Sequence, residues 1–400
     1  MSSRAKFLIV VASTSLVVLL VFGAVAGKSA SPEGPYRHLA VFTEVLSRIK
    51  SEYVEEPDMK SVTLGALNGL LESVDPFASY LSAEQYKEYV KKKDSAKGDV
   101  GVMLAKRAGY VAVVASLPGS PAAQAGINSG DWIEAIKGVA TRDMPLAYAE
   151  LLLRGDPGTT IEVSVFRSRR PEPQKITLKR AAVANPSIHS EMMPDQIGYI
   201  RTETLVPGKP NDVASAISKL EGQGAKRILL DLRNCSFGPP EQGVELANLF
   251  LDKGLITYIQ GQKVPRQNFE ADARKMRTKL PLQVLTNRGT AGGCEVAAAA
   301  LLDNKRGEFV GERTFGSAAV RRTVTLDDGA AIILATAKYY SPSGKAIPDN
   351  GVMPPKLLVE AEAQVEVDED GNPLPQDENA PKKDPGAFIR KAIEMFGHEK

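Results

Sequence analysis

The segment "NRGTAGGCEVAAAALLDNKRGEFVGERTFGSAAVRR", from Asn287 to Arg322, decides the fold of this chain. The segment follows a strand-like run, "LQVLTN". Its alanine-rich part predicts a helix, and its remainder predicts a short strand and then a glycine-containing turn. A loop between a strand and a helix lies at the carboxyl edge of an α/β sheet, where binding and catalytic sites form. The segment therefore predicts a functional loop that opens a helix.

Strand-like and helix-like runs alternate around this segment. The strand-like runs are "IGYIRT", "RILLDLRN" and "GEFVGE", and the helix-like runs include "PNDVASAISKLEGQ" and "GVELANLFLD". This alternation is typical of a mainly parallel sheet that is covered by helices. We therefore expect an α/β core over residues 183–360.

The rest of the chain differs from this core. Residues 36–96 repeat apolar residues at the spacing of one helical face and predict a helical region. Residues 97–182 hold short β-rich runs, such as "YVAVVASL", between turn signals. Residues 361–384 are acidic and contain proline, which favours a flexible segment, and residues 385–400 predict one short helix.

The N-terminus has the pattern of a targeting segment. Residues 1–27 combine a basic start, "MSSRAK", with the apolar run "FLIVVASTSLVVLLVFGAVAG". One interpretation is a signal peptide that is cleaved after Ala24-x-Ala26. The other is an uncleaved membrane anchor, because about 20 apolar residues can span a bilayer. Both interpretations predict that the rest of the chain is extracytoplasmic, in the periplasm or cell envelope.

Charge and histidine content exclude several function classes. The net charge is +2, and no basic stripe with interleaved aromatic residues is present, so we expect no nucleic-acid partner. The three histidines do not stand at a metal-ligand spacing. The sequence therefore argues against a metal site and against a histidine-based catalytic triad.

A series of motifs carries a resemblance to one family. They are "GALNGLLESVDPFASYLS", "GSPAAQAGINSGDWIEAIKG", "LLRGDPGTTIEVSVFR", "LLDLRN", "VLTNRGTAGGCEVAAAAL", "GERTFG" and "AKYYSPSGKAI". In this order they resemble the C-terminal processing peptidases, or tail-specific proteases, over nearly the whole chain after the leader. The resemblance implies an α/β protease core, a PDZ domain over residues 97–182 and a dimerising N-terminal helical region. It also implies cleavage near protein C-termini by a serine nucleophile and a lysine base, without a cofactor.

The positions that carry this chemistry in the family are altered here. The nucleophile position falls at Gly292 in "TAGGCE", and the lysine base falls at Ser317 in "FGS". The supporting glutamine falls at Arg321. Loss of a serine–lysine pair removes several powers of ten in rate. The sequence therefore predicts a catalytically impaired homologue.

The expected oxyanion loop also departs from the family pattern. Its positions are Phe237 and Gly238, together with Gly293 at the start of the helix. Phe237 stands where the family has a glycine. We expect a residue with a Cβ to resist the positive φ that glycine adopts freely.

Alternative catalytic groups remain in the sequence. Cys294, Thr290 and Ser317 are candidate nucleophiles, and a helix N-terminus would lower the pKa of the Cys294 thiol. Lys338 and Lys345 are lysines in a run typical of a strand and a turn. An active serine-type or cysteine-substituted tail-specific endopeptidase therefore stays an alternative.

The predicted PDZ domain retains its peptide-binding features. The expected carboxylate-binding loop is Val100-Gly101-Val102, and Met103 continues into the strand beside which a peptide would add. Arg154 either pairs locally or senses the peptide. These features predict binding of protein or peptide C-termini.

The chain has two cysteines, one in each loop of the expected active site. Because the family fold brings these loops together, the resemblance allows a disulfide between Cys235 and Cys294, and the alternative is two buried thiols.

Because the expected active-site positions are altered, we expect a non-catalytic binding protein that is held at the membrane if its leader stays uncleaved. It would act as a homodimer or as the partner of an active relative, and a dimerising structural scaffold is a second alternative.

Overall fold

The computed structural model describes residues 35–93, 95, 97–142, 144–167, 172–359 and 386–396. The predicted leader, residues 1–27, and the predicted flexible segment, residues 361–384, lie outside these ranges. No helix within the described ranges has the length and apolar character needed to cross a membrane. The described residues form two compact units, which divide between Thr63 and Leu64.

The first unit contains α2 (Pro35–Glu52) and the start of α3 (Met59–Glu72). Leu39, Phe42 and Val45 follow the predicted three-residue spacing along α2, and all three are exposed. In the second unit, α4 (Ala83–Lys93) begins at a capping box, in which the N–H of Gln85 donates to Ser82 Oγ at 3.3 Å and the N–H of Ser82 donates to Gln85 Oε1 at 3.1 Å. The prediction of N-terminal helices is confirmed.

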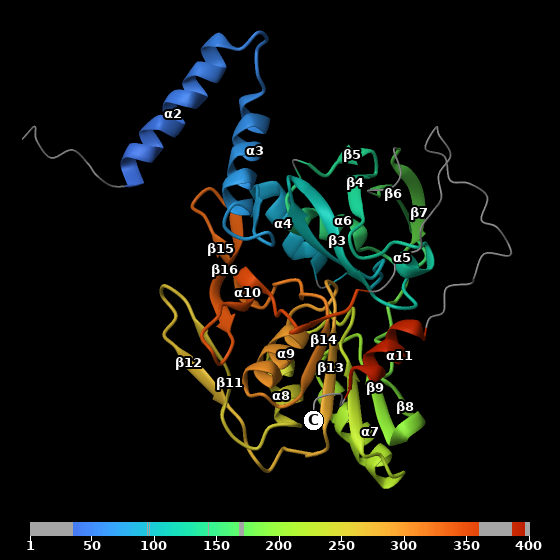
Figure 1. Ribbon diagram of the computed structural model, residues 1–400. Coiled ribbons are helices and arrows are strands. Elements are labelled where there is room, and N and C mark those ends of the chain that lie inside the picture. Colours follow the sequence, from blue (N-terminus) through green and yellow to red (C-terminus); the bar gives the residue numbers. More distant parts are fainter. Residues whose placement is uncertain are drawn as a thin grey trace, which may run out of the picture. The chain divides into compact units, whose positions relative to one another are not determined.

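The core of the second unit is built on one six-stranded sheet (Figure 1). Its strands, in spatial order, are β17 (Lys356–Leu357), β14 (Glu308–Gly311), β13 (Leu282–Thr286), β10 (Arg227–Asp231), β9 (Ile197–Arg201) and β8 (His189–Met193). All neighbours are parallel except β8, which pairs antiparallel with β9. The predicted mainly parallel α/β sheet is confirmed.

Both faces of the centre of this sheet are buried, which explains the continuous apolar run of β10. Ile228 and Leu230 pack against α7 (Lys209–Gly222), α8 (Glu241–Asn248) and α9 (Gly293–Asp303), whereas Leu229 faces a second apolar cluster. That second cluster contains Phe388 of α11 (Ala387–Glu394). Strands buried on both faces carry apolar residues at every position.

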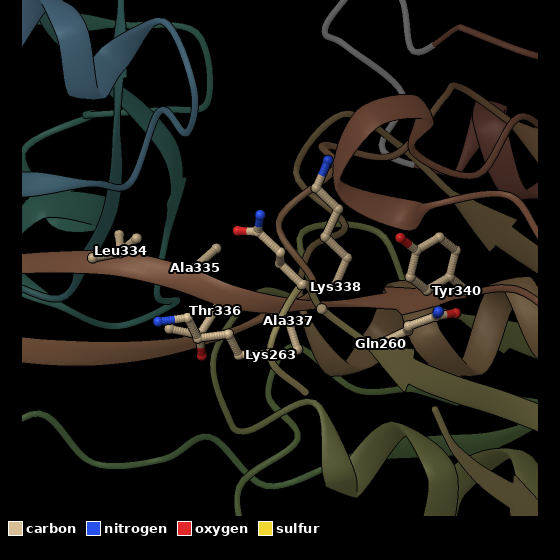
Figure 2. A pocket seen from close by; sticks show the side chains of 10 residues that line it. Gln260, Lys263, Leu334, Ala335, Thr336, Ala337, Lys338 and Tyr340 are labelled. Atoms are coloured by element: carbon tan, nitrogen blue, oxygen red, sulfur yellow. The ribbon is translucent and has the colours of Figure 1, made fainter. Parts of the chain in front are cut away.

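A second, antiparallel sheet was not predicted. It contains β1 (Ser79–Leu81), β16 (Ala331–Tyr340), β11 (Leu255–Gln260), β12 (Gln267–Glu270) and β15 (Ala319–Thr325). Along the edge of β16 that faces away from β15, β1 pairs with Ala331–Ile333 and β11 pairs with Lys338–Tyr340. A cavity of about 630 Å³ opens where β16 runs between these two partners (Figure 2).

The PDZ-like part of the second unit is an antiparallel sheet with two helices. In spatial order its strands are β2 (Val102–Arg107), β3 (Tyr110–Ser116), β4 (Trp132–Ile136), β6 (Thr160–Phe166) and β7 (Gln174–Lys179), with β5 (Val139–Ala140) paired to β4. The helices are α5 (Pro121–Gln124) and α6 (Leu146–Leu153). Strand β2 forms one edge of the sheet, which leaves one side of its backbone available for other partners.

Candidate functional site

The loop after β13 turns sharply into α9 at Gly292. Its backbone has φ +59° and ψ −120°, a conformation that residues with a Cβ adopt only at a cost. A Cβ placed on Gly292 would lie 3.8 Å from its nearest neighbour, the carbonyl oxygen of Gly238, so a methyl group fits there at ordinary contact distance. A strained strand-to-helix turn of this kind presents the nucleophile in many hydrolases, but here the residue has no side chain.

Ser317 lies directly opposite this turn. The backbone N–H of Gly292 donates to Ser317 Oγ at 2.8 Å. A Cβ on residue 292 would lie 4.0 Å from the same oxygen. The structure therefore brings together the two positions that the resemblance pairs as nucleophile and base, and it places a hydroxyl where that pairing needs an amine.

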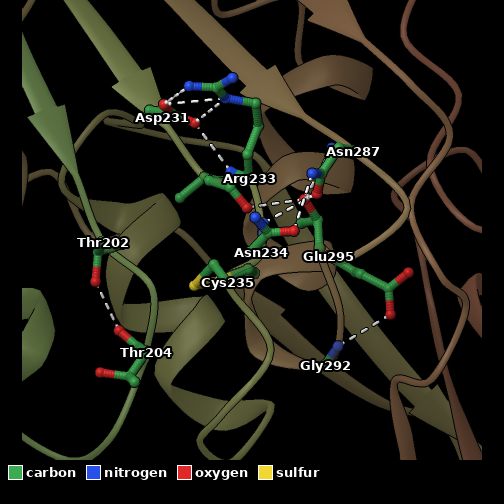
Figure 3. The surroundings of a disulfide bond; sticks show 12 residues. Thr202, Thr204, Asp231, Arg233, Asn234, Cys235, Asn287, Gly292 and Glu295 are labelled. Atoms are coloured by element: carbon green, nitrogen blue, oxygen red, sulfur yellow. Dashed lines mark hydrogen bonds and ion pairs between the residues drawn. A yellow bond between two sulfur atoms is a disulfide. The ribbon is translucent and has the colours of Figure 1, made fainter. Parts of the chain in front are cut away.

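A buried carboxylate holds the two segments together. Glu295, in the first turn of α9, is fully buried and accepts from the N–H group of Gly292 at 3.0 Å (Figure 3). The N–H groups of Gly316 and Ser317 donate to Glu295 at 2.5 Å and 2.8 Å. It also accepts from the hydroxyls of Thr314 at 2.5 Å and Ser317 at 3.2 Å. Burial raises the pKa of Glu295 above its usual value, against the effect of these donors. The sequence motif contains Glu295 but does not by itself assign it this role.

Arg321 occupies the expected glutamine position and touches the same turn. Its Nη1 donates to the carbonyl oxygen of Ser317 at 3.2 Å, and its guanidinium lies 4.2 Å from the ring centroid of Phe77. Its Nε lies 3.5 Å from Asp75 Oδ2. The positive charge at this position therefore stands next to residue 317.

The oxyanion loop makes its tight turn next to Phe237. Phe237 does not adopt a positive φ, as expected of a residue with a Cβ, and within the loop it is Asn234, at +60°, and Gly238, at +118°, that do. The tight turn therefore falls one residue after Phe237. A Cβ on Gly238 would lie 2.1 Å from the carbonyl oxygen of Leu205, so this position requires glycine. Phe237 itself accepts a hydrogen bond from the N–H of Leu205 at 2.6 Å.

The two loops of the site are joined by polar and covalent links. Asn287 Oδ1 accepts from the N–H of Asn234 at 2.9 Å, and Asn287 Nδ2 donates to Asn234 Oδ1 at 3.0 Å (Figure 3). Cys235 and Cys294 form a disulfide with their Cα atoms 6.0 Å apart. Both cysteines are buried. This pairing removes the Cys294 thiol as a nucleophile while the bridge is intact.

The strand that leads into the oxyanion loop ends in a buried ion pair. Asp231 is fully buried, and the Arg233 guanidinium donates to it, with Nη2 at 2.6 Å from Oδ2. The Tyr199 hydroxyl donates to the same carboxylate at 2.8 Å. Although burial acts to raise the pKa of Asp231, the Arg233 guanidinium holds it below its usual value. These contacts fix the direction in which the loop leaves β10.

The alternative catalytic groups are engaged elsewhere. Lys338 Nζ pairs with Asp349, at 2.6 Å from Oδ1 and 2.8 Å from Oδ2, and Lys345 is exposed. Thr290 Oγ1 donates to the carbonyl oxygen of Leu232 at 2.8 Å. The Lys338 amine is therefore engaged by a carboxylate outside the Gly292–Ser317 contact.

The expected carboxylate-binding loop already has a carboxylate. The N–H groups of Val100 and Gly101 donate to Oδ1 of Asp99, at 2.6 Å and 3.0 Å. Arg154 Nε lies 3.3 Å from Asp99 Oδ2, so Arg154 pairs locally. Val102 starts β2, and Met103 lies within it. Asp99 was missed in the sequence because only the backbone of this loop was considered.

Comparison with known proteins decides the family. The sequence profile of peptidase family S41 matches residues 196–355, which include the turn at Gly292. A carboxy-terminal-processing protease from Bartonella bacilliformis is 31% identical over 87% of this chain and 81% of the relative. The chain belongs to peptidase family S41.

Other members of the S41 family agree with this assignment. The carboxy-terminal processing protease CtpA of Bacillus subtilis is 29% identical, over 86% of this chain and 74% of the relative. A solved photosystem II D1 C-terminal processing protease is 28% identical and superposes with a TM-score of 0.66, covering 80% of this chain and 86% of that one. A PDZ-domain profile matches residues 113–167, which begins after the Val100–Val102 loop.

Proposed function

We propose that this S41 family member binds protein C-termini outside the cytoplasm and hydrolyses them poorly or not at all. The relatives named above are processing proteases, and that is the function at the level of the family. The proposed loss of hydrolysis rests on the residues of this chain. The observation that carries it is the turn at Gly292, where the nucleophile position has no side chain.

The chemistry of the surrounding groups supports this proposal. Serine–lysine hydrolysis needs a hydroxyl to attack and an unprotonated amine to take its proton. Across from Gly292, the hydroxyl of Ser317 accepts from the N–H of Gly292 and donates to Glu295. The Ser317 hydroxyl is also buried, so it is closed to a substrate carbonyl. The Cys235–Cys294 disulfide removes the thiol that would be the next candidate.

The PDZ-like part supports a binding role. Strand β2 has a free edge, and an extended peptide can add to such an edge with its carboxylate held by backbone N–H groups. Binding without cleavage would suit a protein that presents or protects C-termini, alone as a homodimer or beside an active relative. The basic and apolar leader supports a location at or beyond the membrane.

Activity can be tested with a denatured substrate that ends in a free apolar C-terminus. We expect the purified protein to leave this substrate intact, as judged by gel electrophoresis and mass spectrometry, while an active S41 relative cleaves it under the same conditions. The variants Ser317→Ala and Cys294→Ala serve as controls. Turnover by the unaltered protein that disappears in either variant would overturn the proposal, because it would identify a displaced nucleophile.

A further inference from the structure

We propose that Asp99 is an internal competitor for the carboxylate-binding loop of the PDZ-like part, and that it sets the affinity for protein C-termini. This inference rests on the proposed binding of C-termini. It follows from three features of one groove: the occupied loop, the free edge of β2, and the closed far end of the same strand.

The loop end of the groove is filled by the side chain of Asp99. A single oxygen, Oδ1, accepts from both Val100 and Gly101, at 2.6 Å and 3.0 Å, and these are N–H groups that would hold a peptide carboxylate. The other oxygen, Oδ2, faces Arg154 Nε at 3.3 Å. Asp99 thus presents to the loop a carboxylate, the same chemical group as a chain terminus. It also forms an ion pair with Arg154.

This internal carboxylate is easy to displace. The Asp99 and Arg154 side chains are 36% and 41% exposed, so water can take over the contacts of both when they separate. Ion pairs this exposed contribute little to stability. Backbone contacts elsewhere keep the loop in place, because Gly98 and Gly155 exchange hydrogen bonds at 2.8 Å and 3.0 Å. The loop therefore keeps its shape when the Asp99 side chain rotates away.

The strand beside the loop offers a short length of free backbone. Lys106 N–H points away from β3, because it donates to the carbonyl oxygen of Pro76 at 2.7 Å. Alternate residues of a strand point the same way, so the backbone groups of Val102 and Leu104 face the same open edge. A peptide can pair with β2 there over about three residues before it reaches Pro76.

The far end of the groove is closed by the chain itself. The N–H of Ala147, at the start of α6, donates to Ser79 Oγ at 3.0 Å, and Phe77 is buried in the same apolar cluster as Leu104 and Ala149. The groove therefore accepts only the last residues of a chain. Val102 and Met103, which are half-buried beside the loop and pack against that cluster, favour an apolar last residue.

The proposal predicts which peptides gain affinity when Asp99 is changed. An incoming carboxylate must displace Asp99 and then lies beside its negative charge. We expect Asp99→Ala to bind a short peptide with a free apolar C-terminus about tenfold more tightly than the unaltered protein does, and Asp99→Asn to lie between them. The same peptide with an amidated C-terminus should bind weakly to all three.

The measurement is a fluorescence-anisotropy titration of the full-length protein in detergent micelles, with a labelled six-residue peptide in its free-acid and amidated forms. Asp156→Asn is the matched control, because Asp156 is an exposed acid in the neighbouring turn and its change alters the net charge equally. It should bind as the unaltered protein does. Thermal unfolding of each variant establishes that the fold is kept.

The outcomes separate the two proposals. If the unaltered protein prefers the free acid but Asp99→Ala and Asp99→Asn bind no more tightly, the competitor role is wrong and the binding of C-termini stands. If the Asp99 variants keep their fold and lose binding, Asp99 supports the loop and the competitor role is again wrong. If no variant distinguishes the free acid from the amide, the binding of C-termini at this loop is itself wrong.

Discussion

The backbone N–H of Gly292 donates to the hydroxyl of Ser317 across 2.8 Å. These residues are 25 positions apart in the sequence, and Glu295 accepts from the backbone of both. The two positions that the resemblance assigns to the nucleophile and the base are thus in contact, and they carry a glycine and a serine. A site of this kind can be rebuilt in steps, and each step tests one part of the account given above.

Restoring the nucleophile and the base should recover little activity. In Gly292→Ser with Ser317→Lys, the new amine stands beside the Arg321 guanidinium, which donates to the carbonyl of residue 317. Adding Arg321→Gln removes this charge, and we expect it to raise kcat/KM for a C-terminal peptide at least about tenfold. Phe237→Gly should add less, since Phe237 has an ordinary backbone conformation. A two-site variant that already equals the four-site variant would contradict this role of Arg321.

Replacing the glycine at the turn should destabilise the protein. Gly292→Ala meets no steric obstacle, but alanine at φ +59° and ψ −120° costs about 1–3 kcal/mol. The free energy of unfolding from urea titration measures this. The matched control is Gly222→Ala in α7, where the added Cβ meets no atom within 4 Å and φ is not positive. An equal effect of both substitutions would show that the backbone of Gly292 is not strained.

Glu295 should be the most sensitive polar residue of the core. In Glu295→Gln an amide NH₂ faces N–H and O–H donors, which leaves buried donors unpaired. We expect a loss on the order of 3 kcal/mol or more in the free energy of unfolding. Glu245→Gln, at an exposed ion pair with Lys275, is the control and should change stability by less than about 1 kcal/mol. A small effect at Glu295 would mean that its donors find other acceptors.

Removing the disulfide should lower stability without unfolding the site. The bridge joins residues 59 apart, and a loop of this length corresponds to about 4 kcal/mol in the chain-entropy account. We expect Cys235→Ala with Cys294→Ala to lose stability of this order, as measured by urea unfolding without reductant. Native protein treated with an alkylating reagent should keep its mass. Alkylation of both cysteines before any reduction would show that the thiols are free in solution.

Glu150 should make stability depend on pH. Burial raises the pKa of Glu150 from 4.5 to about 7. The folded state then holds a proton that the unfolded chain releases, so stability falls as the pH rises from about 4.5 through 7. The facing charges are Arg154, Asp99 and Arg321. We expect Glu150→Gln to be more stable than the unaltered protein by on the order of 2–3 kcal/mol at pH 8, and equal to it at pH 4.

The control for this pH effect is Asp156→Asn, which removes an exposed acid near the same end of α6. Its free energy of unfolding should follow that of the unaltered protein across the same pH range. Glu150→Gln that is no more stable at pH 8 would mean that the carboxylate is already charged and well solvated.

Local sequence patterns were sufficient for the parallel core and for the family. The apolar run at β10 predicts a buried strand, and the alanine-rich run at α9 predicts a buried helix. Both predictions are confirmed because both elements are buried on all sides. The second sheet was missed because β15 and β16 carry mixed polar and apolar residues at a surface. Such strands are defined by their partners, which lie far away in the chain.

In the site, too, the features set by local motifs were predicted, and the features set by tertiary contacts were not. Positions 292 and 317 were found because their neighbours keep the spacing of a known motif. The position of the tight turn, at Gly238, and the Asp99 carboxylate at the PDZ-like loop were not found. Both depend on backbone direction and on which N–H groups a side chain reaches, and residue identity alone does not contain this information.

The Cys235–Cys294 bridge closes a covalent ring that contains α8, β11, β12 and β13. The turn between β11 and β12 lies within this ring and exposes Lys263 and Arg266. A trypsin-like cut in that turn would open the ring without separating its ends. The nicked protein would migrate as one species until a reductant reached the buried sulfurs, so an intact band on a non-reducing gel is no evidence of an uncut chain.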